Sequence, residues 1–330
     1  MRRCRMDLQL GRRDPGMAIE TCVLRDSEEI AAFFLEMTGM KPGFFQLSAG
    51  VIDLSLETVD LGGVTLIWTR SKGRQRWKDY MTGDGLHLGI AVESDGSIQF
   101  RGSDVARTEV AVWHPGVEMD FIMQGPLISL DIGIESWLVE ELGWSINRLP
   151  IAETTNEFLQ KLLHYCSDCS RILERLGTAS PAKPLKTAMR DQVLDLLEPI
   201  LVPWTSSDAA SQTSSISKDY RIMTRAEDLF REFSDPAQLE IGILCRELGV
   251  SRRTLFRAFR QTLGVGPRRY FELRRLYQLR STLKAACSDE TTVTSIANDS
   301  GFTELGRLAG LYKRHFGETP IETLKSSYPH

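Results

Sequence analysis

The sequence predicts a multidomain α+β chain with a β-rich N-terminal part, a helical hairpin and an all-α C-terminal part. Three observations lead to this prediction. Apolar and polar residues alternate in short segments between residues 44 and 134, as they do in half-buried strands. The apolar spacing changes to a helical period after Glu153. Near the C-terminus one segment occurs twice, which indicates a duplicated helical unit.

The N-terminal half begins with a basic segment, residues 1–17, whose glycines and proline predict a flexible tail. Residues 18–40 carry apolar side chains at helical spacing and are expected to form one short element. The expected strands are residues 51–59, 64–68, 86–92, 98–100, 110–113 and 128–134. Turn signals such as Asp95-Gly96 and Gly125-Pro126 separate them, so we expect an antiparallel sandwich or barrel.

Two apolar stripes follow, at residues 158–176 and 185–197, and a short connection between them predicts a helical hairpin. Such stripes are usually core, but a dimer seam is the alternative, because a lone hairpin between domains has little else to pack on. The expected domains are a tail (1–17), a β-rich domain (18–150), a hairpin or dimerisation unit (151–204), a Ser/Thr-rich linker (205–217) and an all-α domain (218–330).

The duplicated segment contains the strongest pattern in the chain. In each copy a small residue lies four positions before a glycine, Gly249 or Gly301, and a hydroxyl residue, Ser251 or Thr303, follows two positions later. A helix-turn-helix needs a small residue for close helix packing, a glycine that tolerates positive φ at the turn and a cap for the second helix. The sequence therefore predicts two helix-turn-helix motifs, joined by a long helix over residues 268–285.

With Gly-Phe at 301–302 and Tyr-Lys-Arg-His-Phe-Gly-Glu-Thr-Pro at 312–320, this repeat resembles the DNA-binding module of AraC/XylS-type bacterial transcription regulators. The resemblance covers about residues 219–326, roughly a third of the chain. It implies an AraC-type DNA-binding domain over residues 218–330. It also implies promoter DNA and RNA polymerase as partners, and activation by a homodimer.

Residues 304–309 and 322–324 resemble the subgroup with a cupin-like or otherwise β-rich regulatory domain, which implies a cupin-like barrel over residues 18–150. Alternation by itself does not choose a cupin over another sandwich. An effector bound in this barrel would alter pairing through the hairpin.

The family pattern places the fourth, seventh and eighth residues after the first turn glycine against bases, here Arg253, Phe256 and Arg257. An arginine can bind guanine O6 and N7, and a phenylalanine can contact a thymine methyl group. Phosphate contacts, which position the protein without specifying a sequence, are expected from Ser251, Arg252, Arg260, Arg268 and Arg269. The alternative is that some of these arginines only solvate the surface or pair with neighbouring glutamates.

The second recognition helix departs from the usual polar pattern, because its outward positions are Leu305, Gly306, Ala309 and Gly310. We therefore expect the first copy to carry most of the base reading. In the second copy, Arg307 is the expected base contact, and the expected backbone contacts are Thr303, Lys313 and Arg314.

Charge is distributed unevenly along the chain. The net charge is −4, yet residues 218–330 carry 19 basic and 14 acidic side chains. A concentrated basic stretch on a mildly acidic protein indicates a local polyanion site, with a solvated helical face as the alternative. Six irregularly spaced cysteines favour a reducing compartment, and neither an export signal nor a membrane span is evident, so we expect a cytoplasmic protein without a membrane partner.

Residues 70–78, Arg-Ser-Lys-Gly-Arg-Gln-Arg-Trp-Lys, are expected to form a basic loop on the otherwise acidic N-terminal part. An anionic effector could bind there, because arginines pair with phosphate or carboxylate and a tryptophan stacks on a base. The candidate residues are Arg70, Arg74, Arg76, Trp77 and Lys78. The Arg-x-x-x-Arg spacing resembles that of PilZ-type cyclic di-GMP receptors, but the same spacing recurs elsewhere and the second PilZ motif is not evident. An uncharged or organic-acid effector and a plain solvated loop remain alternatives.

Enzyme chemistry is not expected, because the five histidines form no His-x-His pattern and no nucleophile and base stand together. We expect no metal and no cofactor beyond a small-molecule effector. Cys166 and Cys169 lie in a helical stripe and lack a second cysteine pair, which disfavours a zinc or redox role. A cupin enzyme with a DNA-binding tail and an RNA-binding or architectural protein are the alternatives, although two turn-stabilised repeats favour duplex DNA.

Overall fold

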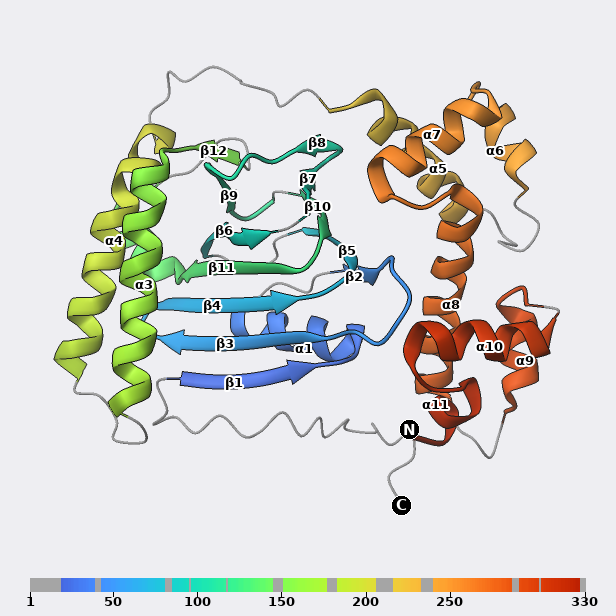
Figure 1. Cartoon of the computed structure of the whole chain (residues 1–330), viewed down its shortest axis with the longest axis horizontal. Helices are drawn as coiled ribbons and strands as arrows, with labels where there is room; N and C mark the ends of the chain where they lie inside the picture. Colours follow the sequence, from blue (N-terminus) through green and yellow to red (C-terminus); the bar gives the residue numbers. More distant parts are fainter. Residues whose placement is uncertain are drawn as a thin grey trace.

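The computed structural model describes residues 19–38, 43–80, 85–94, 96–116, 118–144, 151–176, 183–205, 216–232, 240–286, 291–302 and 304–326. Its strands lie between two groups of helices (Figure 1). We call residues 19–153 the β region and residues 218–326 the helical region. Helices α3 (Asn156–Leu176) and α4 (Lys183–Thr205) lie on the far side of the β region from the helical region. The expected fold class is confirmed, while the tail 1–17 and most of the linker lie outside the described residues.

The β region consists of two antiparallel sheets. The large sheet has the order β1-β3-β4-β11-β6-β9-β12, and the small sheet has the order β2-β5-β10-β7-β8. The strands of the large sheet are β1 (Ile19–Leu24), β3 (Leu54–Asp60), β4 (Val64–Ser71), β6 (Leu86–Ser94), β9 (Glu109–Trp113), β11 (Leu127–Ile134) and β12 (Ile151–Glu153). Those of the small sheet are β2 (Gly43–Gln46), β5 (Arg74–Tyr80), β7 (Ile98–Phe100), β8 (Ser103–Asp104) and β10 (Glu118–Gln124). The short helices α1 (Ser27–Thr38) and α2 (Ser136–Glu141) complete the region.

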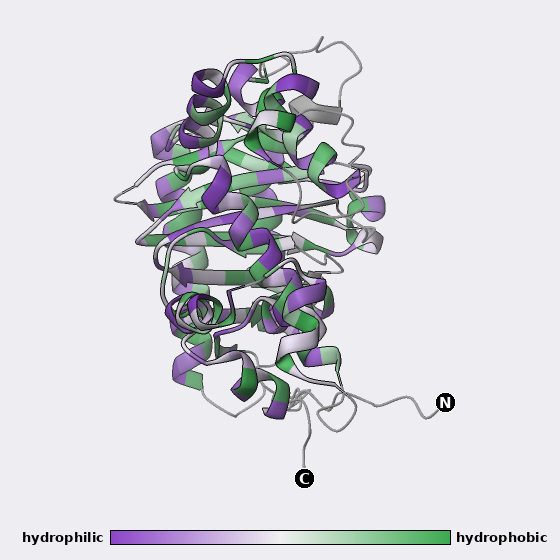
Figure 2. Ribbon diagram, turned by 90° about the vertical axis from the view of Figure 1, so that its right-hand side faces the viewer, coloured by the Kyte–Doolittle hydropathy of each residue, from purple (hydrophilic) through white to green (hydrophobic). Residues whose placement is uncertain are grey.

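Strand β4 shows how the large sheet serves two cores. Leu66 belongs to the core shared with α3 and α4, whereas Ile67 belongs to the core between the two sheets. The Trp68 Nε1–H group donates a hydrogen bond to the hydroxyl of Ser170 on α3, at 3.0 Å. The hairpin therefore packs on the large sheet, and the expectation that it has little to pack on is wrong. Figure 2 shows hydrophobic and hydrophilic residues interleaved along the strands and helices.

The helical region contains both expected helix-turn-helix motifs. Its helices are α5 (Lys218–Glu232), α6 (Ile241–Glu247), α7 (Arg252–Leu263), α8 (Pro267–Ala285), α9 (Val293–Asp299), α10 (Leu305–Phe316) and α11 (Pro320–Ser326). Gly249 and Gly301 have φ of 62° and 77° at the two turns, as their positions predict. The Ser251 hydroxyl accepts a hydrogen bond from the Thr254 amide at 3.1 Å and caps α7. Thr303 lies outside the described residues.

The basic segment at residues 70–78 is not a loop. Strand β4 ends at Ser71, Lys72 and Gly73 form a turn, and β5 begins at Arg74. Its sequence has few apolar residues, yet β5 pairs with both β2 and β10, so it is an interior strand of the small sheet. Within the described segments, no helix has an apolar stretch long enough to cross a bilayer.

Candidate DNA-binding helices and a cavity between the sheets

Helix α7 presents a basic surface. Its exposed arginines are Arg252, Arg253, Arg257 and Arg260. Phe256 is half-buried and packs against the core of the helical region, so its ring is only partly free to meet a base. The Arg257 guanidinium lies 3.1 Å from a carboxylate oxygen of Asp219 on α5. Its side chain remains 55% exposed, so the pair lies at the surface.

Helix α10 differs from α7 in charge. Its exposed basic residues are Arg307, Lys313 and Arg314, and all of them except Arg307 lie in its last turn. Arg307 lies 3.7 Å from Glu272 on α8 and is 71% exposed. On α8, Arg268 is exposed, whereas Arg269 is half-buried and pairs with Glu272 at 2.8 Å. The expected phosphate contact of Arg269 therefore competes with an existing ion pair.

The β region and the helical region share a buried polar cluster centred on Arg76 of β5. The Arg76 guanidinium donates to both carboxylate oxygens of Asp120 on β10, at 2.6 and 2.7 Å. It also donates to both oxygens of Glu227 on α5, at 2.5 and 3.0 Å, and to the Tyr270 hydroxyl of α8 at 2.8 Å. The Tyr220 hydroxyl of α5 donates to Asp120 at 2.7 Å. We call these five residues the Arg76 cluster.

Charge explains why the cluster is stable in the interior. Arg76, Asp120 and Glu227 are 2%, 0% and 6% exposed. Burial by itself would raise the pKa of Glu227, but the charge and hydrogen bonds of Arg76 more than offset this and lower that pKa to about 2. The Lys78 ammonium group lies 3.5 Å from Glu227 and contributes the second positive charge. The carboxylates of Asp120 and Glu227 thus lie beside the cations of Arg76 and Lys78, so both buried negative charges are balanced.

The rest of α8 also lies against the β region. The Tyr277 hydroxyl accepts a hydrogen bond from the Gln46 amide of β2 at 3.0 Å. Farther along the helix, Arg280 and Lys284 lie 2.7 and 2.8 Å from the carboxylate of Asp26. Asp26 is 6% exposed. Burial by itself would raise the pKa of Asp26, but the positive charges of Lys284 and Arg280 more than offset this and lower it. These contacts hold α8 along the outer face of the small sheet.

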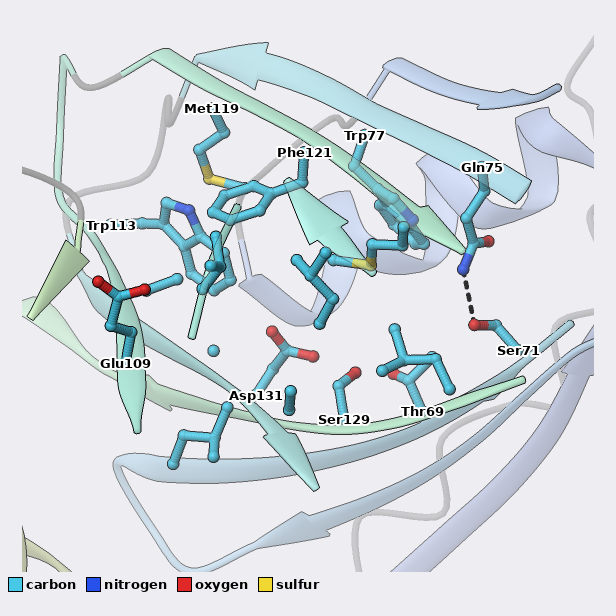
Figure 3. A pocket seen from close by; sticks show the side chains of 18 of the residues that line it. Thr69, Ser71, Gln75, Trp77, Glu109, Trp113, Met119, Phe121, Ser129 and Asp131 are labelled. Carbon is cyan, nitrogen blue, oxygen red and sulfur yellow. Dashed lines mark hydrogen bonds between the residues drawn. The ribbon is translucent and has the colours of Figure 1, made fainter. Parts of the chain in front are cut away.

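A cavity of about 80 Å³ lies between the two sheets. Its wall is predominantly apolar and aromatic, and Trp77, Met119 and Phe121 cover one side of it (Figure 3). Ser129 and Asp131 of β11 lie on the opposite side. The Asp131 carboxylate makes no hydrogen bond or ion pair to another described residue, and burial raises its pKa to about 7. The cavity therefore combines an apolar wall with a few polar groups, as ligand sites often do, and Asp131 is the acid among them that has no partner.

The small sheet connects this cavity to the helical region. On β5, Gln75 and Trp77 line the cavity, while Arg76 between them points to the opposite face and joins the Arg76 cluster. On β10, Met119 and Phe121 line the cavity, while Asp120 joins the cluster. Successive side chains of a strand point to opposite faces. The Arg76 cluster therefore links the two strands that line the cavity to α5 and α8.

The five expected effector residues do not form one site. Arg70 is exposed on β4, and Arg74 binds the side-chain oxygen of Gln124 at 2.6 Å. Arg76 is enclosed in its cluster, and Lys78 lies 3.8 Å from Glu118 as well as near Glu227. The Trp77 ring is 9% exposed and makes edge contacts with two phenylalanine rings. A shared surface for an anion is therefore not formed by these side chains.

Sequence reasoning missed the three acids that matter most here. Asp131 stands alone in the apolar run 128–134, and an isolated acid in a strand of this kind is a signal that could have found it. Asp120 and Glu227 are 107 positions apart in the chain, so no local pattern could have paired them with Arg76. Within the described part of the chain, no three or more His, Cys, Asp or Glu residues are grouped as a metal site would require.

Comparison with known proteins relates the C-terminal third to transcription regulators. Residues 244–326 match the family model described as a helix-turn-helix domain. The chain is 38% identical over 88 residues to the probable thc operon regulatory protein of Rhodococcus erythropolis, over 27% of this chain and 26% of that protein. It is 37% identical over 99 residues to the XylDLEGF operon transcriptional activator of Pseudomonas putida, over 30% of this chain and 29% of that protein. The chain thus spans less than a third of the length of these relatives.

Two solved structures resemble a larger part of the chain at low identity. The AraC-like transcriptional activator CuxR matches with a TM-score of 0.42 and 15% identity, over 85% of this chain and 100% of that one. The structure of ToxT from Vibrio cholerae with an unsaturated fatty acid bound matches with a TM-score of 0.28 and 12% identity, over 79% of this chain and 94% of that one.

Proposed function

The C-terminal segment of this chain is homologous to AraC/XylS-type transcription regulators, and on that premise we propose that the protein is an effector-responsive regulator that binds promoter DNA. The observation that carries this proposal is the pair of helix-turn-helix motifs joined by α8, with an arginine-rich α7. Two recognition helices on one connecting helix can enter successive major grooves, and arginines supply both phosphate and base contacts.

The first motif reads most of the sequence. Arg253 and Arg257 are exposed on α7 at the expected base-contacting positions, and an arginine bound to guanine O6 and N7 discriminates by about 1–3 kcal/mol. Arg257 exchanges its pair with Asp219 for a base on binding. Arg252, Arg260 and Arg268 hold phosphates. The second motif anchors the complex through Thr303, Lys313 and Arg314, with Arg307 as its base contact.

The effector binds in the cavity between the sheets and acts through the small sheet. The cavity and the Arg76 cluster share β5 and β10, so a ligand that shifts these strands changes how α5 and α8 are held. This arrangement favours a small, largely apolar effector. It gives no support to cyclic di-GMP, because Arg70, Arg74 and Arg76 are directed to three different surroundings.

The protein acts as a homodimer that recruits RNA polymerase. Ile172, Leu176 and Leu185 of the hairpin are exposed apolar side chains that do not join the core on the large sheet. A second hairpin could cover them, and linked DNA-binding units would gain affinity through effective concentration. Light scattering should give a dimer mass for the wild type and a monomer mass for Ile172→Glu.

The DNA-binding proposal is tested with an operator selected by the purified full chain from a random duplex library. Arg253→Ala and Arg257→Ala should lose about 1–3 kcal/mol on the selected site and little on random DNA. Arg268→Ala should weaken binding to both alike and reduce the salt slope by about 1. Lys161→Ala, an exposed lysine of α3, is the matched control and should bind like the wild type.

Failure to enrich any duplex sequence would overturn the proposal. Equal binding of the arginine variants and the control would overturn the assigned roles. A preference for RNA of the selected sequence over duplex DNA would favour an RNA-binding protein instead.

A further inference from the structure

The wall of the cavity is well suited to a positive charge. Trp77, Trp113 and Phe121 line it from β5, β9 and β10, and aromatic faces attract cations. Asp131 comes from β11, which lies between β4 and β6 in the middle of the large sheet. Its carboxylate points into the cavity opposite Trp77 and Phe121 (Figure 3). A cation placed here would meet one carboxylate and several aromatic rings.

The structure leaves space next to this carboxylate. Gly89 of β6 is the register partner of Asp131. A Cβ atom at position 89 would lie 3.2 Å from the Asp131 Oδ1 atom and 2.4 Å from the Trp113 ring. Any larger side chain at position 89 would therefore clash with the Trp113 ring and press against the Asp131 carboxylate. The glycine keeps the carboxylate open to the cavity.

Other charged groups near the cavity already have partners. Lys78 also lines it, but its ammonium group lies 3.5 Å from Glu227 and 3.8 Å from Glu118. Glu109 accepts a hydrogen bond from the Ala106 amide. Asp131 is partly buried and has no such partner among the residues the structure describes. Its carboxylate lines the cavity without a cation beside it. A ligand that supplies a cation therefore gains an interaction that no described protein group offers.

Resting on the proposed function, in which this cavity holds the effector, we infer that the ligand is a small primary amine. Its ammonium group donates to Asp131, and its compact apolar body lies among Trp77, Trp113 and Phe121. A carboxylate ligand is disfavoured because it would place a second negative charge beside Asp131. A neutral alcohol of the same shape can form a hydrogen bond but lacks the charge-assisted contact and the attraction to the rings.

The test compares three probes that share one ring and one carbon, namely benzylamine, benzyl alcohol and benzoate, by calorimetric titration of the full chain at pH 8. Benzylamine should bind at least ten-fold more tightly than benzyl alcohol, and benzoate should not bind. Asp131→Asn should reduce benzylamine affinity at least ten-fold and leave benzyl alcohol within about three-fold. Asp195→Asn, which neutralises an exposed acid on α4, should bind all three probes like the wild type.

A second measurement needs no variant. Between pH 8 and pH 6, benzylamine should bind progressively more weakly to the wild type, because Asp131 takes up a proton while the amine stays charged. Benzyl alcohol should change little. Benzoate binding as tightly as benzylamine, or no response to any primary amine from methylamine to phenethylamine, would overturn the inference. Since DNA binding is measured separately, an amine failure with intact operator binding refutes the ligand class and leaves the proposed regulator standing.

Discussion

Replacing Arg76 with methionine should strongly destabilise the protein. The methionine keeps much of the length of the side chain but leaves Asp120 and Glu227 buried without their shared cation. At an effective dielectric of about 20, two unit charges about 4 Å apart interact by about 4 kcal/mol, and Arg76 makes two such pairs. The desolvation of Arg76 offsets part of this sum, and Lys78 stays beside Glu227. We therefore expect a net loss of about 3–5 kcal/mol in the free energy of unfolding.

Guanidinium chloride unfolding of the full chain measures this loss. Lys72→Met is the matched control, because the Lys72–Asp53 pair has a similar length of 2.7 Å but both side chains are more than half exposed. That variant should unfold close to the wild type. Adding Asp120→Asn and Glu227→Gln to Arg76→Met should recover more than half of the loss, because the orphaned charges are then removed. A loss below about 1 kcal/mol for Arg76→Met, typical of surface pairs, would refute the reasoning.

Three further predictions concern single residues. Burial lowers the pKa of His315 to about 4. As the pH falls from 6.5 to 4, the His315 imidazole therefore takes up a proton in the unfolded chain but not in the folded one, and the folded state loses stability. His315→Leu should therefore make the melting temperature less sensitive to acid, and an unchanged pH profile would contradict this. Gly89→Ala places a methyl group 2.4 Å from the Trp113 ring, should cost about 1–3 kcal/mol in urea unfolding, and should abolish benzylamine binding. Asp219→Ala removes the ion-pair partner of Arg257, and an exposed pair of this kind is worth about 0.2–1 kcal/mol. Operator affinity, measured by fluorescence anisotropy, should therefore rise by up to about five-fold. Weaker binding would show that Asp219 positions Arg257 instead.

The helix-turn-helix motifs could be predicted because their determinants are local. A glycine at each turn and a hydroxyl two positions later are separated by fixed short distances in the sequence, and the structure places Gly249 and Gly301 at positive φ as expected. The start of α7 at Arg252 likewise follows from the Ser251 cap. The predicted limits of α8, residues 268–285, are close to the observed limits, Pro267–Ala285, because a proline in the first turn and the glycine before it mark the start of the helix.

The role of β5 could not be predicted from local sequence. Its successive residues Arg74, Gln75, Arg76 and Trp77 are too polar for a typical interior strand, so the sequence predicts a basic loop that could bind an anionic effector. In the structure, however, one face of the strand meets the cavity and the other meets the helical region. What buries Arg76 is a helix about 150 positions later in the chain, and such long-range partners leave no periodic signal.

The attachment of α8 along its length has a consequence for the proposed binding of DNA. Tyr270, Tyr277, Arg280 and Lys284 recur at helical spacing and all face the β region, so the helix is clamped at several points rather than at one end. A helix held in this way fixes the distance and orientation between the two proposed recognition helices, α7 and α10. One base pair inserted between the half-sites rotates the second half-site about the DNA axis by roughly a tenth of a turn. A rigidly held α8 cannot adjust to this rotation. Operators should therefore tolerate base changes between the half-sites far better than any change in their spacing.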